Sequence, residues 1–285
     1  MAGLSSTPDD NKPLWQGDPV ATFSDWTIEI ARIEGEAEPE SGDDTPEWKR
    51  QKVGSGKVSD EDVKDLETHD ATSPEVYHVH RVFLSYGTRR SEYFARLFQN
   101  GKNFAEGKNN TSHIRLHALA ASAFPSLLDY VYQPDKSIEF TTENASALYH
   151  LGEYFEIESL RSDALKFCKD NIDLSNFPTY TKHATIFREN VLLECIAKFL
   201  GKRIMDVIPS DSILELLSPG MFKNGLLQVA NKEDLYVSRR VSRFVAAFVK
   251  VHWKKLSIDE FWRITSPDVM PHVSHAVALE FCEAE

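Results

Sequence analysis

The residues best suited to chemistry in this sequence are two histidines, His78 and His80. The alternating run Tyr77-His78-Val79-His80 predicts a short strand with both imidazoles on one face, an arrangement that metal ions can use. No third ligand has a suitable spacing nearby, and His113 and His117 do not supply one. A structural or exposed role is therefore the better interpretation of both side chains.

Nucleophilic and nucleotide chemistry have little support. The one serine flanked by glycines, Gly54-Ser55-Gly56, lies in an acidic segment that would not hold a nucleophile against a base. The sequence has no P-loop and no G-x-G-x-x-G pattern. Three distant cysteines without a C-x-x-C spacing predict neither a disulfide framework nor a zinc ribbon (Cys168, Cys195, Cys282). We therefore expect no catalytic residue, no cofactor and no metal.

Charge is distributed unevenly along the 285 residues, whose net charge is −12. Residues 34–75 hold 14 acidic and 5 basic residues, whereas the chain from Val76 onward is balanced. An acidic front disfavours nucleic acid, since phosphates need cations. No run is long and apolar enough to span a membrane, and the first residues do not resemble a secretory signal. We expect a cytoplasmic and/or nuclear protein with protein partners and neither nucleic-acid nor membrane binding.

The elements that would position these residues begin with a flexible tail over residues 1–21, which contains Pro8, Pro13 and Pro19. Alternation from Phe23 to Ile33 predicts a half-buried strand. Residues 34–75 are rich in Glu, Asp, Gly, Ser and Pro, and this composition predicts a disordered acidic insertion. The insertion either engages a basic partner or only solvates the chain.

A strand-to-helix joint follows at Tyr77–Phe98, and a second short strand is predicted at His113–Leu116. Apolar spacing predicts a helix from Ala121 to Tyr132, stopped by Pro134, and further helices to the end of the chain. Thr142, Ser212 and Ser257 are the predicted N-caps. The predicted core of the first part contains the largest residues on the apolar helical faces (Phe94, Phe98, Phe124, Leu128, Leu148).

Four phrases of the sequence, in order, resemble the BTB/POZ domain. They are Ser24-Asp25-Trp26, the joint YHVHRVFLSYGTRRSEYFARLF, the phrase AFPSLLDYVY and the phrase LYHLGEYFEIESL. The resemblance implies an α+β fold, a small sheet capped by helices, over residues 22–175. The helices of residues 176–285, with DSILELLSPGMF as the best phrase, are similar to an all-α BACK region.

The resemblance implies a non-catalytic protein-interaction adaptor that links a bound protein to a type-3 cullin ubiquitin ligase. In cullin-binding members a hydrophobic-x-Glu triplet precedes a strand, and Phe104-Ala105-Glu106 has that position. A surface loop with a lone Phe is the alternative. A self-associating scaffold or nuclear regulator without a ligase role is the alternative function.

Asp25 and Arg81 match a charged pocket at BTB dimer interfaces, and the alternative is an intrachain pair that holds strand to helix. A homodimer is therefore expected from the resemblance, although Pro13 and Pro19 leave no room for the long leading helix that family dimers usually exchange.

A predicted helix over Val237–Leu256 carries basic residues opposite its apolar stripe (Arg239, Arg240, Arg243, Lys250, Lys254, Lys255). This side either contacts a partner or a phosphate, or is only the solvated face of the helix.

Overall fold

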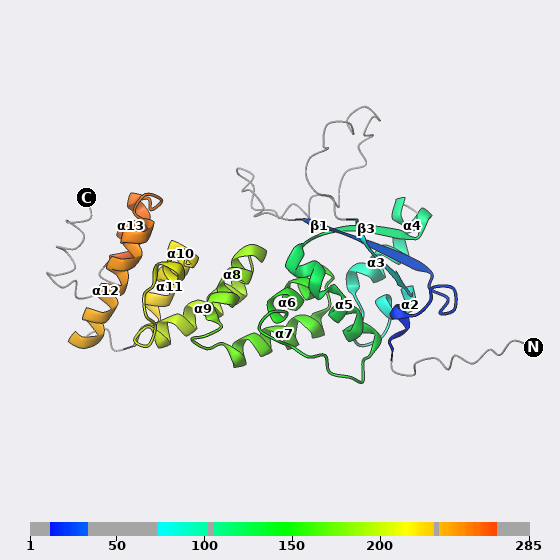
Figure 1. Ribbon diagram of the computed structural model, residues 1–285, viewed down its shortest axis with the longest axis horizontal. Helices are drawn as coiled ribbons and strands as arrows, with labels where there is room; N and C mark the ends of the chain where they lie inside the picture. Colours follow the sequence, from blue (N-terminus) through cyan, green and yellow to red (C-terminus); the bar gives the residue numbers. More distant parts are fainter. Residues whose placement is uncertain (1–11, 34–72, 102–104, 231–233, 267–285) are drawn as a thin grey trace, which may run out of the picture.

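The computed structural model describes residues 12–33, 73–101, 105–230 and 234–266. The molecule is elongated, with a small sheet and its helices at one end and a succession of helices that leads to the other end (Figure 1). The sheet and the helices packed on it are therefore one mixed α+β unit, and the rest of the described chain is helical.

The sheet has three strands in the order β2-β1-β3, so the strand that comes first in the sequence lies in the middle. β1 (Trp26–Ile33) pairs antiparallel with β2 (Glu75–Val79) and parallel with β3 (Thr111–His117). Alternate residues of β1 are buried, beginning with Trp26, because side chains of a strand point to opposite faces. The predicted strands are present, but their ends differ. β1 is three residues shorter at its start, β3 is longer at both ends, and β2 begins two residues before Tyr77 and ends at Val79, which leaves His80 as the N-cap of α2.

Six helices pack with this sheet: α2 (Arg81–Ser85), α3 (Glu92–Asn100), α4 (Ala105–Asn109), α5 (Ala118–Tyr132), α6 (Ala145–Tyr154) and α7 (Glu158–Asn171). Phe94 is fully buried, and its ring stacks on Phe98 and Phe155 at centroid distances of 5.7 and 5.3 Å. Of the predicted core residues, Phe98 is only partly buried, and the other four are buried.

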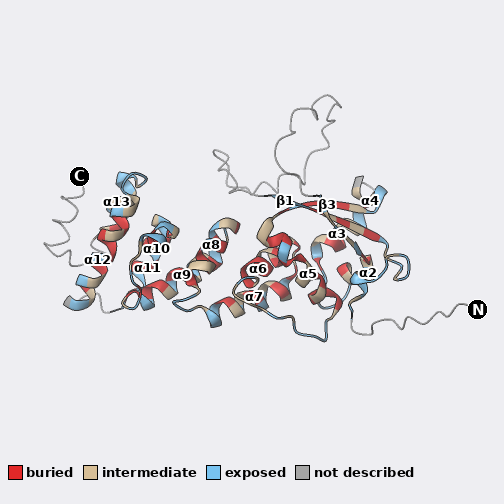
Figure 2. Ribbon diagram, in the orientation of Figure 1, coloured by how far each residue is buried: buried red, intermediate tan, exposed pale blue. Residues whose placement is uncertain are grey.

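The remaining helices are α8 (Phe177–Phe187), α9 (Asn190–Arg203), α10 (Asp211–Leu216), α11 (Pro219–Leu227), α12 (Leu235–His252) and α13 (Ile258–Ile264). Their buried faces turn toward one another (Figure 2) and form a second hydrophobic cluster. Phe140 and Leu165 pack against both clusters, so the two cores are in contact.

Helix starts show where local prediction fails. The capping box of Ser257 and Glu260 is confirmed. Ser212 does not cap a helix, because α10 already begins at Asp211 with Ser210 as its N-cap. The prediction of Thr142 as an N-cap is also wrong. The N-cap of α6 is Asn144, whose side-chain Oδ1 accepts a hydrogen bond from the backbone N–H of Thr141.

The start of the chain differs from the predicted tail. Leu14–Gln16 form a 3-10 helix, η1, and the indole Nε1 of Trp15 donates to Asp129 Oδ1 at 3.0 Å. The Trp15 ring lies 6.0 Å from that of Tyr77. Partial burial of the indole, with its N–H satisfied, holds this segment against the sheet and α5. The predicted insertion lies outside the described residues, except for its last three, of which Glu75 begins β2.

Candidate functional site

Asp25 and Arg81 form an intrachain pair where β1 begins and α2 begins. Asp25 Oδ1 accepts the backbone N–H of Arg81 at 2.8 Å, and Oδ2 accepts Nε–H at 3.0 Å. Asp25 thereby satisfies a free N–H at the first turn of α2, where His80, the N-cap, makes no side-chain cap bond. The guanidinium also lies 5.6 Å from the centroid of the Trp26 ring. Both side chains keep some exposure, 46% for Asp25 and 40% for Arg81, so the pair can still meet another molecule.

Large apolar side chains flank this pair in the exposed surface. Val82 lies in α2, Tyr86 follows the helix as its C-cap, and Phe23 precedes Asp25 by two residues with 85% of its surface exposed. Phe23 also has φ of 58°, a left-handed conformation that is costly for a bulky side chain. A strained backbone that presents an aromatic ring to solvent is a feature expected of a contact surface.

The two histidines considered for metal binding point to different surroundings. His80 is buried: its Nδ1 and its backbone N–H both lie within hydrogen-bond distance of the Tyr132 hydroxyl, at 3.0 and 2.7 Å. Its Nε2 lies 2.7 Å from the Thr22 carbonyl, which can only accept, so Nε2 carries the proton and Nδ1 accepts from Tyr132. His78 is exposed beside Thr27 of β1. Over the described residues no three metal-ligating side chains gather.

Glu106 lies in the first turn of α4, between α3 and β3. Burial raises the pKa of its carboxyl, while the positive charge of His113 lowers it in part. The negative charge of Glu106 contributes to the raised pKa of Tyr93 and of Tyr154, whose main cause is burial. Glu106 is therefore half withdrawn from water beside two tyrosines. Phe104, the other residue of the predicted triplet, lies outside the described residues.

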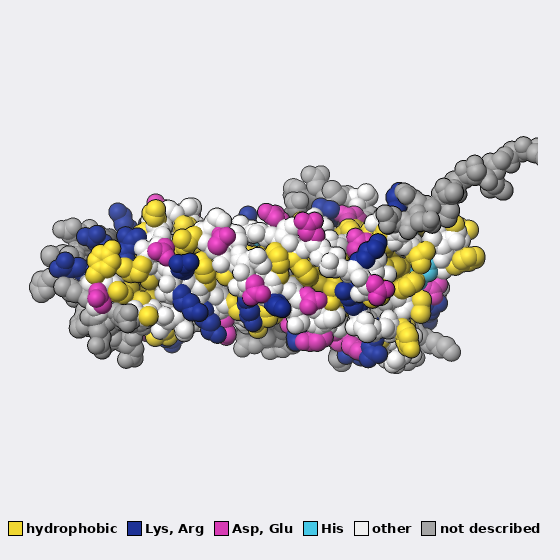
Figure 3. Space-filling view, turned by 90° about the horizontal axis from the view of Figure 1, so that it is seen from below, with side chains coloured by type: hydrophobic (Ala, Val, Ile, Leu, Met, Phe, Trp, Pro, Cys, Tyr) yellow, Lys and Arg dark blue, Asp and Glu magenta, His cyan; other side chains and the backbone are white. Residues whose placement is uncertain are grey.

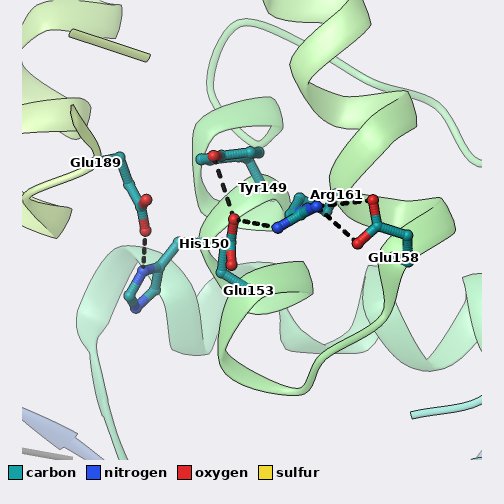
Figure 4. Close-up of polar contacts among 6 residues, drawn as sticks. All are labelled: Tyr149, His150, Glu153, Glu158, Arg161 and Glu189. Carbon is teal, nitrogen blue, oxygen red and sulfur yellow. Dashed lines mark hydrogen bonds and ion pairs between the residues drawn. The ribbon is translucent and has the colours of Figure 1, made fainter. Parts of the chain in front are cut away.

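A polar junction that the sequence did not reveal joins α6 to α7 and to the turn before α9 (Figure 4). Arg161 donates to Glu153 at 2.9 Å and to Glu158 at 2.7 Å, and His150 Nδ1 lies 2.8 Å from Glu189 Oε1. His150 comes from α6 and Glu189 from the turn after α8, 39 residues later, so no local spacing could reveal the pair. These contacts link α6 to α7 and to the segment between α8 and α9.

One open hollow lies between η1 and the end of α5, with a volume of 410 Å³. Gln16, Asp129 and Lys136 are among its mostly polar lining residues, and the Asp129 carboxylate is already engaged by Trp15.

None of the described helices combines the length and apolarity needed to cross a bilayer.

Comparison with known proteins identifies part of the α+β unit. A family model of the BTB/POZ domain matches residues 70–172, from just before β2 to the end of α7. A search of curated proteins finds no match. BTB/POZ domains are protein-interaction and dimerisation modules and are generally non-catalytic. The stretch of residues 70–172, which holds β2, β3 and helices α2 to α7, is therefore a BTB/POZ domain.

Proposed function

We propose that this protein is a non-catalytic adaptor that links a bound protein to a type-3 cullin ubiquitin ligase, in the cytoplasm or the nucleus. The observation that carries the proposal is the place of Glu106, in the first turn of the short helix between α3 and β3 of a BTB/POZ domain. This is the position of the hydrophobic-x-Glu triplet in cullin-binding relatives. The helices of residues 176–285 would be a BACK-like region that holds the adaptor's second partner.

The proposed roles of Phe104 and Glu106 follow from their chemistry. An aromatic side chain supplies a large apolar anchor, and a carboxylate supplies orientation through a charge-assisted hydrogen bond. Glu106 is half-buried, so its carboxylate has lost part of its hydration, and this burial raises its pKa. A partner donor would therefore gain more from this carboxylate than from a fully hydrated one.

Co-precipitation with purified type-3 cullin tests the proposal. Phe104→Ala combined with Glu106→Lys should abolish binding and leave the circular dichroism spectrum unchanged. Glu194→Lys is the matched control, because Glu194 is an exposed carboxylate on α9, away from α4, and the same charge reversal there should not affect binding. Loss of binding in the control, or retention in the double variant, would contradict the assigned site.

A self-associating scaffold without a ligase role is the second candidate function. It is favoured by the exposed Val82, Tyr86 and Phe23 around the Asp25–Arg81 pair. If the unmutated protein does not bind the cullin at concentrations of about 1 µM or above, the adaptor proposal fails and the scaffold takes its place. Light scattering tests self-association directly: a mass of 32.4 kDa indicates a monomer, and twice that mass a dimer.

Arg81→Glu separates the two roles of the charged pair. It places a second negative charge beside Asp25 and should convert a dimer to monomers if the pair lies at the interface. If the dimer persists while the thermal unfolding temperature drops, the pair acts only within the chain.

A further inference from the structure

Three basic residues are exposed on one side of α12. Arg239, Arg243 and Lys250 are exposed and lie within a narrow arc of the helix, because their spacings of four and seven residues return to the same side. Lys254 and Lys255 extend the basic stretch beyond the helix. In Figure 3 dark blue side chains gather at the end of the molecule where α12 and α13 lie.

The opposite face of α12 is fixed in the second hydrophobic cluster. Val241, Phe244, Val245 and Phe248 are buried there, and Phe248 stacks on Phe222 at a centroid distance of 4.1 Å. The helix therefore cannot rotate to hide its basic face. Arg240, at the border, donates to the Val207 carbonyl at 3.2 Å and belongs to the packed side.

The stretch of sequence that carries the basic face contains no acidic residue. Between Asp234 and Asp259 the sequence has six Lys and Arg residues and neither Asp nor Glu. A solvated helix face is usually mixed in sign, since pairs of opposite charge stabilise an exposed helix. Five exposed cations without a negative charge among them raise the local potential and attract an anionic ligand.

An exposed aromatic group adjoins the basic face. Trp253 follows α12 directly, and its ring lies 6.4 Å from that of Phe261, which in turn lies 5.7 Å from Trp262. Trp262 is 64% exposed, and Ile258 on the same short helix is 74% exposed. Large apolar side chains beside arginines are the composition found at the energetic centre of protein interfaces.

We infer that the exposed face of α12 with Trp253, Ile258 and Trp262 binds an acidic peptide segment of a partner protein, one that carries large apolar side chains among its acids. Carboxylates would pair with Arg239, Arg243 and Lys250, and an apolar side chain would cover Trp262. The basic row from Arg239 to Lys250 is about 16 Å long at 1.5 Å per residue, which about five residues of extended peptide would span. A nucleic acid is the less favoured ligand, because its backbone offers no apolar side chain to cover the exposed Ile258 and Trp262.

This surface is independent of the proposed cullin site. α12 and α13 lie at the end of the molecule opposite α4 (Figure 1), so both surfaces can be occupied at once. The inference therefore stands even if the protein does not bind a cullin.

Fluorescence anisotropy on the full chain tests the inference with a labelled peptide, Asp-Glu-Leu-Phe-Glu-Asp. Arg239→Glu combined with Arg243→Glu should weaken the peptide's Kd at least about tenfold, and Trp262→Ala at least about threefold. Lys198→Glu combined with Lys202→Glu is the matched control, because these exposed lysines have the same spacing on α9, and it should stay within about twofold of the unmutated protein. A peptide with Asn and Gln in place of its acids should bind weakly to every variant.

Three outcomes would overturn the inference. They are no detectable binding of the acidic peptide at low salt, an equal loss in the α9 control, or tighter binding of a labelled single-stranded RNA than of the peptide at the same salt concentration. Thermal unfolding of each variant checks folding. If the double charge reversal unfolds the protein, Arg239→Gln combined with Arg243→Gln serves instead and should weaken the peptide's Kd at least about threefold.

Discussion

His183 is a buried imidazole in α8, only 7% exposed, and its Nδ1 has no hydrogen-bond partner among the residues that the structure describes. Burial lowers its pKa, as do the positive charges of Lys182 and His117, while the carboxylate of Glu143 acts in the opposite direction. The folded protein therefore holds His183 neutral at a pH where the unfolded chain has begun to bind a proton.

The sign of the pH dependence follows from this lowered pKa. The contribution of His183 to stability is complete above the unfolded pKa of about 6.5 and is lost as the pH falls toward the lower folded value. We expect the thermal unfolding temperature to fall between about pH 7.5 and pH 5, and His183→Gln to reduce that slope. His78→Gln is the control, because His78 is exposed; an unchanged slope in His183→Gln would contradict the assignment.

The sequence predicts the roles of some single residues but not their distant partners. Residue types and order were enough to expect the Asp25–Arg81 pair as one of two alternatives, and the intrachain bonds are present. For His80 the sequence predicts only a structural role. Its hydrogen-bond partners Tyr132 and Thr22 lie 52 and 58 residues away in the sequence. Long-range pairs of this kind leave no local spacing to detect.

At the scale of elements, α3 is fixed to the rest of its domain by Phe94. The ring is fully buried against Phe98 and Phe155, so Phe94→Ala leaves a large cavity and should lower the free energy of unfolding by about 3–5 kcal/mol. Phe23→Ala removes the same atoms from an exposed site and should change it by less than about 0.5 kcal/mol. Chemical denaturation measures both, and similar losses in the two variants would contradict the packing described here.

Two glycines give a second test at this scale. α9 and α11 approach closely at Gly201, where an added Cβ would overlap the Gly225 carbonyl oxygen and lie 2.6 Å from Gln228 Cβ. Gly201→Ala should therefore destabilise the protein by about 1–3 kcal/mol.

Gly220 is the matched control for that crossing. It lies in the first turn of α11 with open space around it, so Gly220→Ala should be neutral or stabilise the protein by up to about 1 kcal/mol. Differential scanning calorimetry compares the two variants. A loss in Gly220→Ala as large as that in Gly201→Ala would show that helix packing is not the cause.

Elements were more predictable than their ends. The long helices follow from apolar spacing, and α5 ends at Tyr132 as expected. The N-caps of α6 and α10 were misplaced by two residues, because several Ser, Thr and Asn residues near each start can all cap a helix. η1 was missed, since its stability comes from Trp15 packing on a distant helix.

At the scale of the whole molecule, two deletions of similar length should differ sharply in their effect on stability. Deleting residues 1–33 removes β1 with its buried Trp26, Ile28 and Ile30, and we expect the protein to lose its cooperative unfolding transition. Replacing residues 35–73 with a short Gly-containing turn removes none of the described core residues and should leave thermal stability nearly unchanged.

The second deletion has a structural rationale in the pairing of β1 with β2. Ile30 of β1 lies opposite Glu75 of β2, and Arg32 Nε donates to Glu75 Oε1 at 2.6 Å, so the two ends to be joined already lie on neighbouring strands. A loss of several kcal/mol in this variant would show that residues 35–73 contribute to the folded core.

The central position of β1 has a consequence for synthesis on the ribosome. β1 ends at Ile33 and is made before both of its neighbours, and its parallel neighbour β3 ends at His117, some 84 residues later. At about 5–20 residues per second, synthesis of these 84 residues takes roughly 4–17 seconds, and β3 cannot pair with β1 before then. Until β3 is made, one edge of β1 stays unpaired and open to other nascent chains or a chaperone, so the rate of translation between β1 and β3 should affect the yield of native protein.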